Sequence, residues 1–444
     1  MRFPDLLATR RGRLAAFFFM YMTEGIPVGF STVALTTQMH HQGYSATQIG
    51  FFSGTVLMPW AWKWAIGPFV DTIYSERHGR RRLWIIATQV AIVLSLLACM
   101  GFHMSTQLYL FMAMLTVANA CAATQDVAID ALAVGTLPEN ELGLANGFMF
   151  AGQSLGIAGG GGLVLVIAER LAAYGISFSY MHLFVGGLVA LVTIFVVLPM
   201  REPHSASDFK TDETGFTAAV DELRAYGREA WKTFRYSRVS SLGLLFAIIP
   251  IGSMALAPAF QQKFSVALQL TDKNVGLLAI CSNVAFSSGC LLGGWLADRY
   301  NHRRMLVIFV ILMALPDLIL AHALQDAGWI RPDKVVAAGP SENLLVTFWI
   351  AAISYNFFEG MMYPPRNAIF MSITNPAVAA TQFTAYMAIL NIVISYSQYW
   401  QGWAMDHWGY VPTLIVDGLS GLLCLLVLPF MRDTRRSAEP ATAP

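Results

Sequence analysis

Charged residues are scarce in this chain of 444 residues. Asp, Glu, Lys and Arg together make up 12% of the sequence and apolar residues 56%, whereas about 25% of the residues of soluble domains are charged. The formal net charge is only +1, and the sequence shows neither the basic excess nor the recognition motifs that are typical of nucleic-acid-binding proteins. The composition therefore predicts a membrane protein whose surroundings are the lipid bilayer, with no nucleic-acid partner.

The sequence has few residues that bind metals or cofactors. Its five cysteines lie within apolar runs, without a Cys-x-x-Cys pair or the spacing of metal ligands. It also lacks the Gly-rich phosphate loop with its Lys, which argues against nucleotide-driven pumping. The pair His40 and His41 falls in a predicted outer loop, and no nucleophile with a neighbouring base stands out in the apolar runs. We therefore expect no cofactor, no bound metal and no enzymatic activity.

Long apolar runs dominate the chain. A helix needs roughly 20 mostly apolar residues to cross about 30 Å of hydrocarbon, and twelve such runs occur between polar or turn-rich breaks. They lie near residues 14–38, 47–70, 83–102, 106–135, 142–167, 177–199, 240–262, 274–297, 305–323, 343–369, 377–403 and 410–430. The sequence thus predicts an all-α membrane protein with twelve transmembrane helices.

The basic residues are distributed unevenly between the two sides of these spans. One side holds 22 Lys and Arg residues, and the other side holds five. Because basic loops remain in the cytoplasm, both chain termini are predicted to be cytoplasmic. The long connector near residues 200–239 carries apolar residues at roughly helical spacing among basic ones, which predicts an amphipathic helix on the cytoplasmic membrane surface.

A motif repeats at the same place in each half of the chain. "GPFVDTIYSERHGRRR" follows the second span and "GWLADRYNHRR" follows the eighth, and both contain Gly-x-x-x-Asp before a basic cluster. The repeat predicts two six-helix bundles, residues 1–199 and 240–431, joined by the linker 200–239 and followed by a cytoplasmic tail, 432–444.

The two loop motifs resemble the hallmark of the major facilitator superfamily. This resemblance implies two pseudo-symmetric bundles with alternating access to a solute site between them. It also implies that the loop Asp bonds to neighbouring helix ends and that basic partners help to lock the inward-closed state. The implied gate residues are Gly67, Asp71, Arg80 and Arg81 in the first copy and Gly294, Asp298, Arg299 and Arg303 in the second.

Three further segments resemble one branch of that superfamily. They are "EGIPVGF" at 24–30, "PWAWKWAIGPFVD" at 59–71 and "ATQDVAIDA" at 123–131. Together they are similar to AmpG-type muropeptide permeases, acetyl-coenzyme A transporters and related bacterial siderophore permeases. The resemblance implies a monomeric, proton-coupled permease of the inner membrane that imports a bulky polar or anionic solute.

Several ionisable side chains fall deep inside predicted spans of the first half. A charged group at the centre of a membrane helix costs roughly 2.5–3.5 kcal/mol, so it is expected to face a polar cavity or a partner. Asp126 and Asp130, next to Gln125, are one turn apart and share a helix face. Lys63 lies at a depth that suits pairing with either Asp, and Glu24 lies near mid-membrane. These groups predict a proton-coupling device, and the alternative is a permanent structural salt bridge.

The tenth span of the second half carries a different set of polar residues. Glu359, Tyr363 and Arg366 follow one another at helical spacing, and Pro364 and Pro365 are predicted to break or kink the helix. Broken membrane helices usually line a solute cavity, so these three side chains are candidate cavity residues. The alternative is a kink that only shapes packing, with Arg366 as a cytoplasmic anchor. Two other membrane carboxylates, Asp317 and Asp417, are interpreted as structural.

A glycine-rich stretch keeps a second function open. "GQSLGIAGGGG" at 152–162 allows close helix approach, and it resembles a motif of drug–proton antiporters, with Ile157 in the place of the proline. The alternatives to an importer are therefore a proton antiporter that exports amphipathic compounds and a membrane sensor that binds solute without moving it.

Overall fold

The computed structural model describes residues 5–44, 46–72, 79–104, 106–202, 228, 238–256, 261, 264–265, 267–270, 272–329, 339–375 and 378–431. Nearly all of the predicted linker helix and the whole predicted tail lie outside these residues. The described part is helical and contains no β-strand. By internal contacts the chain divides into two compact units: residues 1–138, 148–234 and 374–385 form the first, and residues 139–147, 235–373 and 386–444 form the second.

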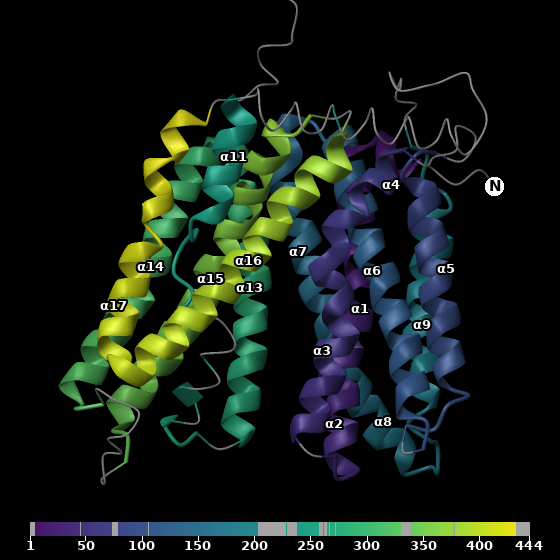
Figure 1. The fold of residues 1–444 in the computed structure, drawn as a ribbon, viewed down its shortest axis with the longest axis horizontal. Helices are drawn as coiled ribbons and strands as arrows, with labels where there is room; N and C mark the ends of the chain where they lie inside the picture. The colour runs from purple at the N-terminus through teal and green to yellow at the C-terminus, as the bar shows by residue number, and fades with distance from the viewer. Residues whose placement is uncertain are drawn as a thin grey trace, which may run out of the picture. The chain divides into compact units, whose positions relative to one another are not determined.

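The first unit consists of helices that lie side by side (Figure 1). Helix α1 runs alongside α6, and α6 is flanked by α3 and α5. The elements are α1 (Arg10–Gly29), α2 (Leu35–His41), α3 (Ala46–Trp62), α4 (Gly67–Thr72), α5 (Arg82–Cys99), α6 (Leu108–Thr136), α7 (Leu142–Ala158), α8 (Val164–Ala172) and α9 (Tyr180–Val192). The first residues of α7, 142–147, belong to the second unit. Wide π-turns join α1 to α2 and α7 to α8; they are η2 (Phe30–Ala34) and η5 (Gly159–Leu163).

The second unit is built around one long helix. Helix α15 packs against both α13 and α14, and α14 also packs against α17. The elements are α11 (Arg238–Ile248), α13 (Asp272–Tyr300), α14 (His302–Asp326), α15 (Glu342–Ile373), α16 (Ala379–His407) and α17 (Tyr410–Ser420). The first residues of α16, 379–385, belong to the first unit. Asn301 begins α14, since its side chain accepts hydrogen bonds from the N–H groups of Arg303 and Arg304.

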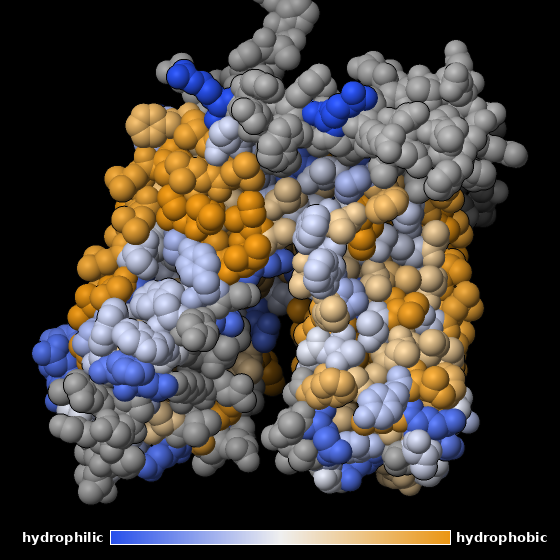
Figure 2. Space-filling model, viewed as in Figure 1, coloured by the Kyte–Doolittle hydropathy of each residue, from blue (hydrophilic) through white to orange (hydrophobic). Residues whose placement is uncertain are grey.

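Ten helical segments of the described residues are long and apolar enough to cross a membrane, so this is a multi-pass membrane protein. Hydrophobic residues cover much of the helix sides in Figure 2, and hydrophilic residues gather towards the helix ends. The predicted spans near 47–70 and 240–262 are not among the ten. Helix α3 ends at Trp62 before a 3₁₀ turn, Lys63–Ala65, and α11 ends at Ile248. The total of twelve membrane spans and the cytoplasmic position of both termini remain predictions.

Glycines bring α1 and α7 into backbone contact. A Cβ added at Gly156 would overlap the carbonyl oxygen of Met22, and a Cβ at Gly160 would overlap that of Ile26. From the other side, a Cβ at Gly25 would overlap the carbonyl oxygen of Gln153. The glycine-rich stretch therefore lets two membrane helices approach closely, as its small residues predict.

Candidate functional site

A buried ion pair lies within the first unit. The Lys63 Nζ atom is 2.5 Å from Asp126 Oδ2, and the two side chains are 9% and 6% exposed. Lys63 opens the 3₁₀ turn between α3 and α4, while Asp126 belongs to α6, which packs against that turn. The ammonium group also lies 5.7 Å from the ring centroid of Trp60. The predicted pairing of Lys63 with a carboxylate of α6 is thus present in the structure.

Asp130, one turn along α6, has a different partner. Its Oδ1 accepts a hydrogen bond from the Tyr21 hydroxyl of α1, and Asp130 is 3% exposed. The sequence reasoning missed Tyr21. The only signal available was its position one turn before Glu24 on the same helix, and tyrosine in a membrane span is more often a packing or interfacial residue.

Glu24 and Gln125 complete this group. The Glu24 side chain is fully buried, and its Oε2 accepts a 3.3 Å hydrogen bond from Gln153 of α7. Glu24 Oε1 has no hydrogen-bond partner among the described residues. Gln125 donates to Thr23 Oγ1 at 2.7 Å and to the carbonyl oxygen of Met20 at 3.2 Å. These bonds hold α1, α6 and α7 in register around the carboxyl groups.

The buried cluster contains three carboxyl groups and one ammonium group. Glu24, Asp126 and Asp130 all interact electrostatically with Lys63 and with one another. If all four groups were ionised, the three carboxylates and the Lys63 ammonium group together would carry a net charge of −2. A buried charge without compensation is costly. The cluster is therefore suited to taking up and releasing protons, or to binding a cationic group.

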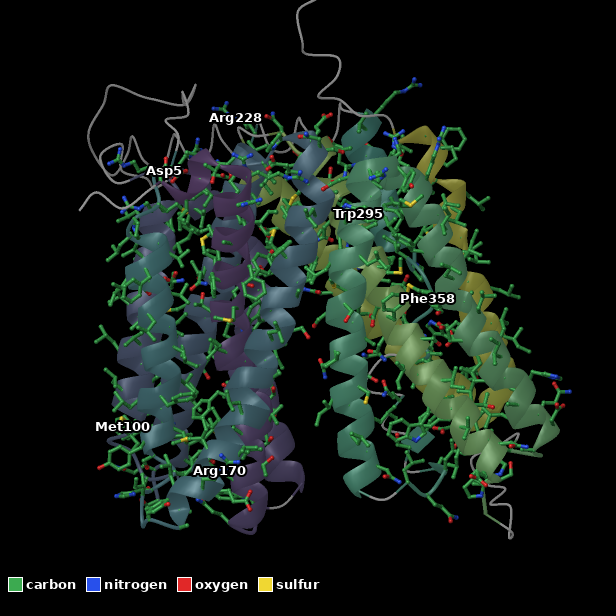
Figure 3. The ribbon with its side chains drawn as sticks, turned by 180° about the vertical axis from the view of Figure 1, so that it is seen from behind. Asp5, Met100, Arg170, Arg228, Trp295 and Phe358 are labelled. Atoms are coloured by element: carbon green, nitrogen blue, oxygen red, sulfur yellow. The ribbon has the colours of Figure 1, made fainter. Side chains whose placement is uncertain are left out.

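The candidate residues of the second unit lie on α15. The Arg366 guanidinium carbon is 4.0 Å from the ring centroid of Tyr363, one turn earlier on α15, and Arg366 Nε donates to Asn367 Oδ1 at 3.2 Å. Glu359 is half-buried and interacts electrostatically with Arg366. In Figure 3, Phe358, the neighbour of Glu359, lies nearer the middle of this unit than Trp295 does. The three predicted cavity residues thus form one continuous group.

The sequence predicts a break or a kink at Pro364 and Pro365; the break is wrong, and the kink stays a prediction. Helix α15 runs without interruption from Glu342 to Ile373, with both prolines inside it. Each proline removes one backbone donor, but the helix is packed against α13 on one side and α14 on another. This tertiary packing outweighs the loss of two hydrogen bonds, so the argument that a broken helix lines the cavity does not apply here.

The first loop carboxylate binds the start of a distant helix. Asp71 accepts hydrogen bonds from the backbone N–H groups of Ala380, at 3.3 Å, and Thr381, at 3.0 Å, in the first turn of α16. Gly67 makes this approach possible, since a Cβ there would lie 2.9 Å from the Cα of Thr381. Both contact regions belong to the first unit.

The basic cluster after Asp71 surrounds the same loop. Arg81 Nη2 lies 3.6 Å from Asp71 Oδ1, and Arg80 Nε donates to the backbone oxygen of Asp71 at 3.1 Å. Glu202 accepts hydrogen bonds from the N–H groups of Arg81 and Arg82 at 2.8 and 2.9 Å. Glu202 is a partner that the sequence reasoning did not identify.

The second loop repeats the arrangement within the second unit. Asp298 accepts hydrogen bonds from the N–H groups of Gly143, at 2.7 Å, and Leu144, at 2.8 Å, in the first turn of α7. A Cβ at Gly294 would overlap the carbonyl oxygen of Gly143. His302 Nε2 lies 3.0 Å from Asp298 Oδ1, a contact not foreseen from the motif.

The two predicted arginines of this second copy have contacts of their own. Arg299 lies over the rings of Trp295 and Tyr300, at 5.6 and 5.8 Å from the two centroids. The Arg303 backbone N–H donates to Asn301 Oδ1 at 3.0 Å. Aromatic stacking thus accounts for the position of the Arg299 guanidinium group, which the sequence reasoning had placed with the gate carboxylate.

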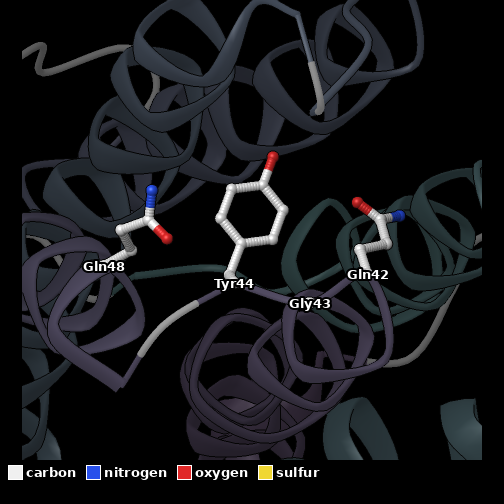
Figure 4. Close-up of a pocket in the computed structure, with 4 residues that line it drawn as sticks. All are labelled: Gln42, Gly43, Tyr44 and Gln48. Carbon is white, nitrogen blue, oxygen red and sulfur yellow. The ribbon is translucent and has the colours of Figure 1, made fainter.

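A polar pocket of about 560 Å³ lies elsewhere in the first unit (Figure 4). The Tyr44 ring stands between the amide groups of Gln42 and Gln48, and Gly43 completes the lining. Figure 3 places Met100 and Arg170 at one end of this unit and Asp5 at the other. None of the predicted site residues lines this pocket.

The sequence as a whole matches a known transporter family. The family model described as Major Facilitator Superfamily matches residues 14–397 and 242–443. The chain belongs to this superfamily. Membership agrees with the prediction of a transporter that is not an enzyme, and it confirms the family inferred from the loop motifs.

Curated relatives of the chain include a permease and an efflux protein. The anhydromuropeptide permease of Escherichia coli strain K12 is 26% identical over 426 residues, which cover 94% of this chain and 79% of the relative. Macrolide efflux protein A of Streptococcus pyogenes is 21% identical over 400 residues, with 88% and 87% covered. The first of these belongs to the branch that the three sequence segments indicated.

Solved structures of the superfamily share the fold. The E. coli fucose:proton symporter matches with a TM-score of 0.64 at 14% identity, covering 95% of this chain and 98% of the symporter. A proton:xylose symporter matches with a TM-score of 0.64 at 13% identity, covering 96% and 97%. A human organic anion transporter matches with a TM-score of 0.66 at 12% identity, covering 94% and 99%. These likenesses establish the all-helical major facilitator fold.

Asp298→Ala is expected to lower the free energy of unfolding by about 0.5–2 kcal/mol, the range for losing a helix cap. The substitution removes the acceptor of two backbone N–H groups at the start of α7. Thermal unfolding of the purified protein measures the change. Asp326→Ala, an exposed carboxylate on α14, is the control and should have little effect. Equal unfolding temperatures for the two variants would contradict the capping role.

Proposed function

We propose that this protein is a proton-coupled transporter of the inner membrane, which works as a monomer and imports a bulky polar or anionic solute. The observation that carries the proposal is the excess of carboxyl groups over cations in the buried cluster of Glu24, Lys63, Asp126 and Asp130. Such a cluster changes its charge when it binds protons, and it lies on the helices of a transporter fold. Similarity to an anhydromuropeptide permease and to two proton symporters supports the same proposal.

The chemistry of the side chains limits the class of solute. Arg366 and Lys63 are the buried cations of the two candidate groups, and Tyr363 and Gln125 supply polar groups beside them. A solute with carboxylate or phosphate groups offers the acceptors that guanidinium and ammonium groups bind. Muropeptides, siderophores and acyl-coenzyme A-like compounds have this character and are the first solutes to test.

The loop carboxylates are proposed as gate residues in this cycle. Asp71 and Asp298 each hold the first turn of a helix through two backbone hydrogen bonds. Breaking these bonds would release the helix end, so their formation and loss are suited to closing and opening one side of the protein. The same arrangement of a carboxylate bound to a helix end occurs at equivalent places in the two copies of the repeat, which supports the same gating role for Asp71 and Asp298.

Asp126→Asn is expected to reduce gradient-driven accumulation by roughly 5- to 150-fold, the usual range of coupling between two ligand sites. Membrane vesicles with and without an imposed proton gradient would be given a labelled muropeptide, siderophore and acyl-coenzyme A. The variant keeps the size of the side chain but cannot take up a proton, so it should still exchange solute. Asp326→Asn serves as the control.

The outcomes of this assay separate the competing functions. Normal accumulation by folded Asp126→Asn would contradict proton coupling through this carboxylate and favour a structural salt bridge. Similarity to macrolide efflux protein A and the glycine-rich stretch favour one second candidate, a proton antiporter for amphipathic compounds. Expulsion of a macrolide in exchange for protons would support that candidate. Solute binding without flux would indicate a sensor.

A further inference from the structure

The second unit contains a largely buried segment without helical structure. Helix α11 ends at Ile248, and residues 249–256 continue in a non-helical course. Gly252 has a φ of +81°, and its N–H donates to the carbonyl oxygen of Gly421 at 3.1 Å. Backbone groups outside a helix need other partners inside a membrane, so the contacts of this segment decide whether it is stable.

Asp417 of α17 supplies the most important of these contacts. Its Oδ2 accepts hydrogen bonds from the N–H groups of Met254, at 2.7 Å, and Ala255, at 2.8 Å. Its Oδ1 accepts a hydrogen bond from the side-chain amide of Gln401 in α16. A carboxylate offers about four acceptor sites. Donors of the described residues fill three of these sites, and one site on Oδ1 is left for a further donor.

A second carboxyl group, Asp317, belongs to α14, which packs against α17. The next residue after Asp417, Gly418, lies against Ala314 and Leu318 of α14, since a Cβ there would be 3.7–3.8 Å from atoms of these two residues. Asp317 is fully buried, and neither of its oxygens has a hydrogen-bond partner among the described residues. It interacts electrostatically with Asp417. Two adjacent ionised carboxylates repel strongly at a buried position. An ionised Asp317 would therefore lie next to a like charge, and the hydroxyl group of Ser253, which acts on it, already donates to the carbonyl oxygen of Met313 at 3.0 Å.

The other helices around Asp317 provide no compensating charge. Helix α15 contributes Tyr355, whose hydroxyl donates to the carbonyl oxygen of Ser253 at 2.9 Å. Helix α17 contributes Asp417 itself, and no titratable group of α13 among the described residues acts on Asp317. The charge balance at this position is consequently negative unless a proton or another cation is bound.

We propose that Asp317 and Asp417 together form a proton-binding site in the second unit, separate from the cluster around Lys63. Asp317 carries the proton, and its O–H donates to the open acceptor site on Asp417 Oδ1. No other bond is made or broken, and the proton comes from the aqueous phase. A proton fits this position better than a metal ion, because full burial of Asp317 leaves no water-sized space at its carboxyl group.

The proton at this site stabilises the non-helical segment. With one proton bound, Asp417 remains the single negative acceptor of the Met254 and Ala255 N–H groups. When that proton leaves, the two carboxylates repel each other and the position of Asp417 is disturbed. The segment 249–256 is thus firmly held while the proton is bound, and it loosens as the pH rises.

Infrared difference spectroscopy of the purified full-length protein tests the proposal. Unmutated protein minus Asp317→Asn is expected to show the carbonyl band of a non-hydrated carboxylic acid at neutral pH. Asn keeps a donor towards Asp417, so the variant should fold. Asp326→Asn, an exposed carboxylate of the same helix, is the matched control and should show a carboxylate band instead. A carboxylate band for Asp317 at neutral pH would overturn the proposal, as would a band that responds to sodium but not to potassium.

A second measurement needs no substitution. Hydrogen exchange of the peptide covering 249–256 is followed with rising pH and corrected for the intrinsic rate. Protection of this peptide is expected to fall at least about tenfold, or about 1.4 kcal/mol, over the pH range in which the acid band disappears. Protection that is independent of pH would contradict a proton shared by Asp317 and Asp417.

Discussion

Lys63→Met is expected to lower the free energy of unfolding by about 3–5 kcal/mol, the range observed when one partner of a buried ion pair is removed. Met fills a similar volume but has no charge, so Asp126 would lose the ammonium group that lies 2.5 Å away. The same change leaves Glu24 and Asp130 without a nearby cation in the cluster. Thermal unfolding in detergent, monitored by circular dichroism, measures the effect.

The double variant Lys63→Met with Asp126→Asn is the control for this prediction. It removes both charges of the pair and is expected to recover most of the lost stability, because no unpaired charge remains from the pair. An additive loss in the double variant would show that the two residues act independently. A stable double variant that no longer accumulates solute would separate the coupling role of the pair from its structural role.

Gly156→Ala is expected to destabilise the protein by about 1–3 kcal/mol, as over-packing of a well-packed core does. The new methyl group would overlap the Met22 carbonyl oxygen and lie 3.1 Å from the Cα of Gly25. These are backbone atoms of α1, so the clash can be relieved only by moving the helix. The unfolding temperature measures the loss, and reduced transport should accompany it, since Glu24 lies on the displaced helix.

Gly162→Ala is the matched control for this substitution. Gly162 lies in the same glycine-rich stretch, but a Cβ there would meet no atom within 4 Å. Alanine costs less backbone entropy than glycine, so this variant should be neutral or slightly more stable. If both substitutions destabilise equally, contact between α1 and α7 is not the reason that these glycines are present.

The sequence predicted the position of Lys63 better than that of its neighbours. Depth within a span follows from counting residues at 1.5 Å each, so Lys63 and Asp126 could be assigned to the same level. Tyr21 could not be found in this way, because its contact with Asp130 depends on how α1 packs against α6. The functional role of the cluster stays a prediction, since position alone does not reveal proton movement.

The loop motifs illustrate a similar limit. Their repeat was visible in the sequence, and so was the carboxylate that each copy contributes. The helix ends that Asp71 and Asp298 bind lie more than 150 residues away, at 380–381 and 143–144. Such pairing is determined by the fold and not by local spacing. For the same reason the helix break expected at Pro364 and Pro365 is absent, because packing along α15 outweighs the local tendency of proline to interrupt a helix.

The π-turns η2 and η5 change which face of the helix the residues after them occupy. A regular helix has 3.6 residues per turn, or about 100° per residue, and a π-turn accommodates an additional residue. Positions beyond Phe30–Ala34 are therefore displaced by about one residue from the face that α1 would predict, and the same holds beyond Gly159–Leu163. Because η2 and η5 contact each other, the additional residue in one helix is matched by one in its neighbour. An alignment with transporters whose helices are regular would need a one-residue gap at both turns, so that the residues that follow the turns are compared correctly.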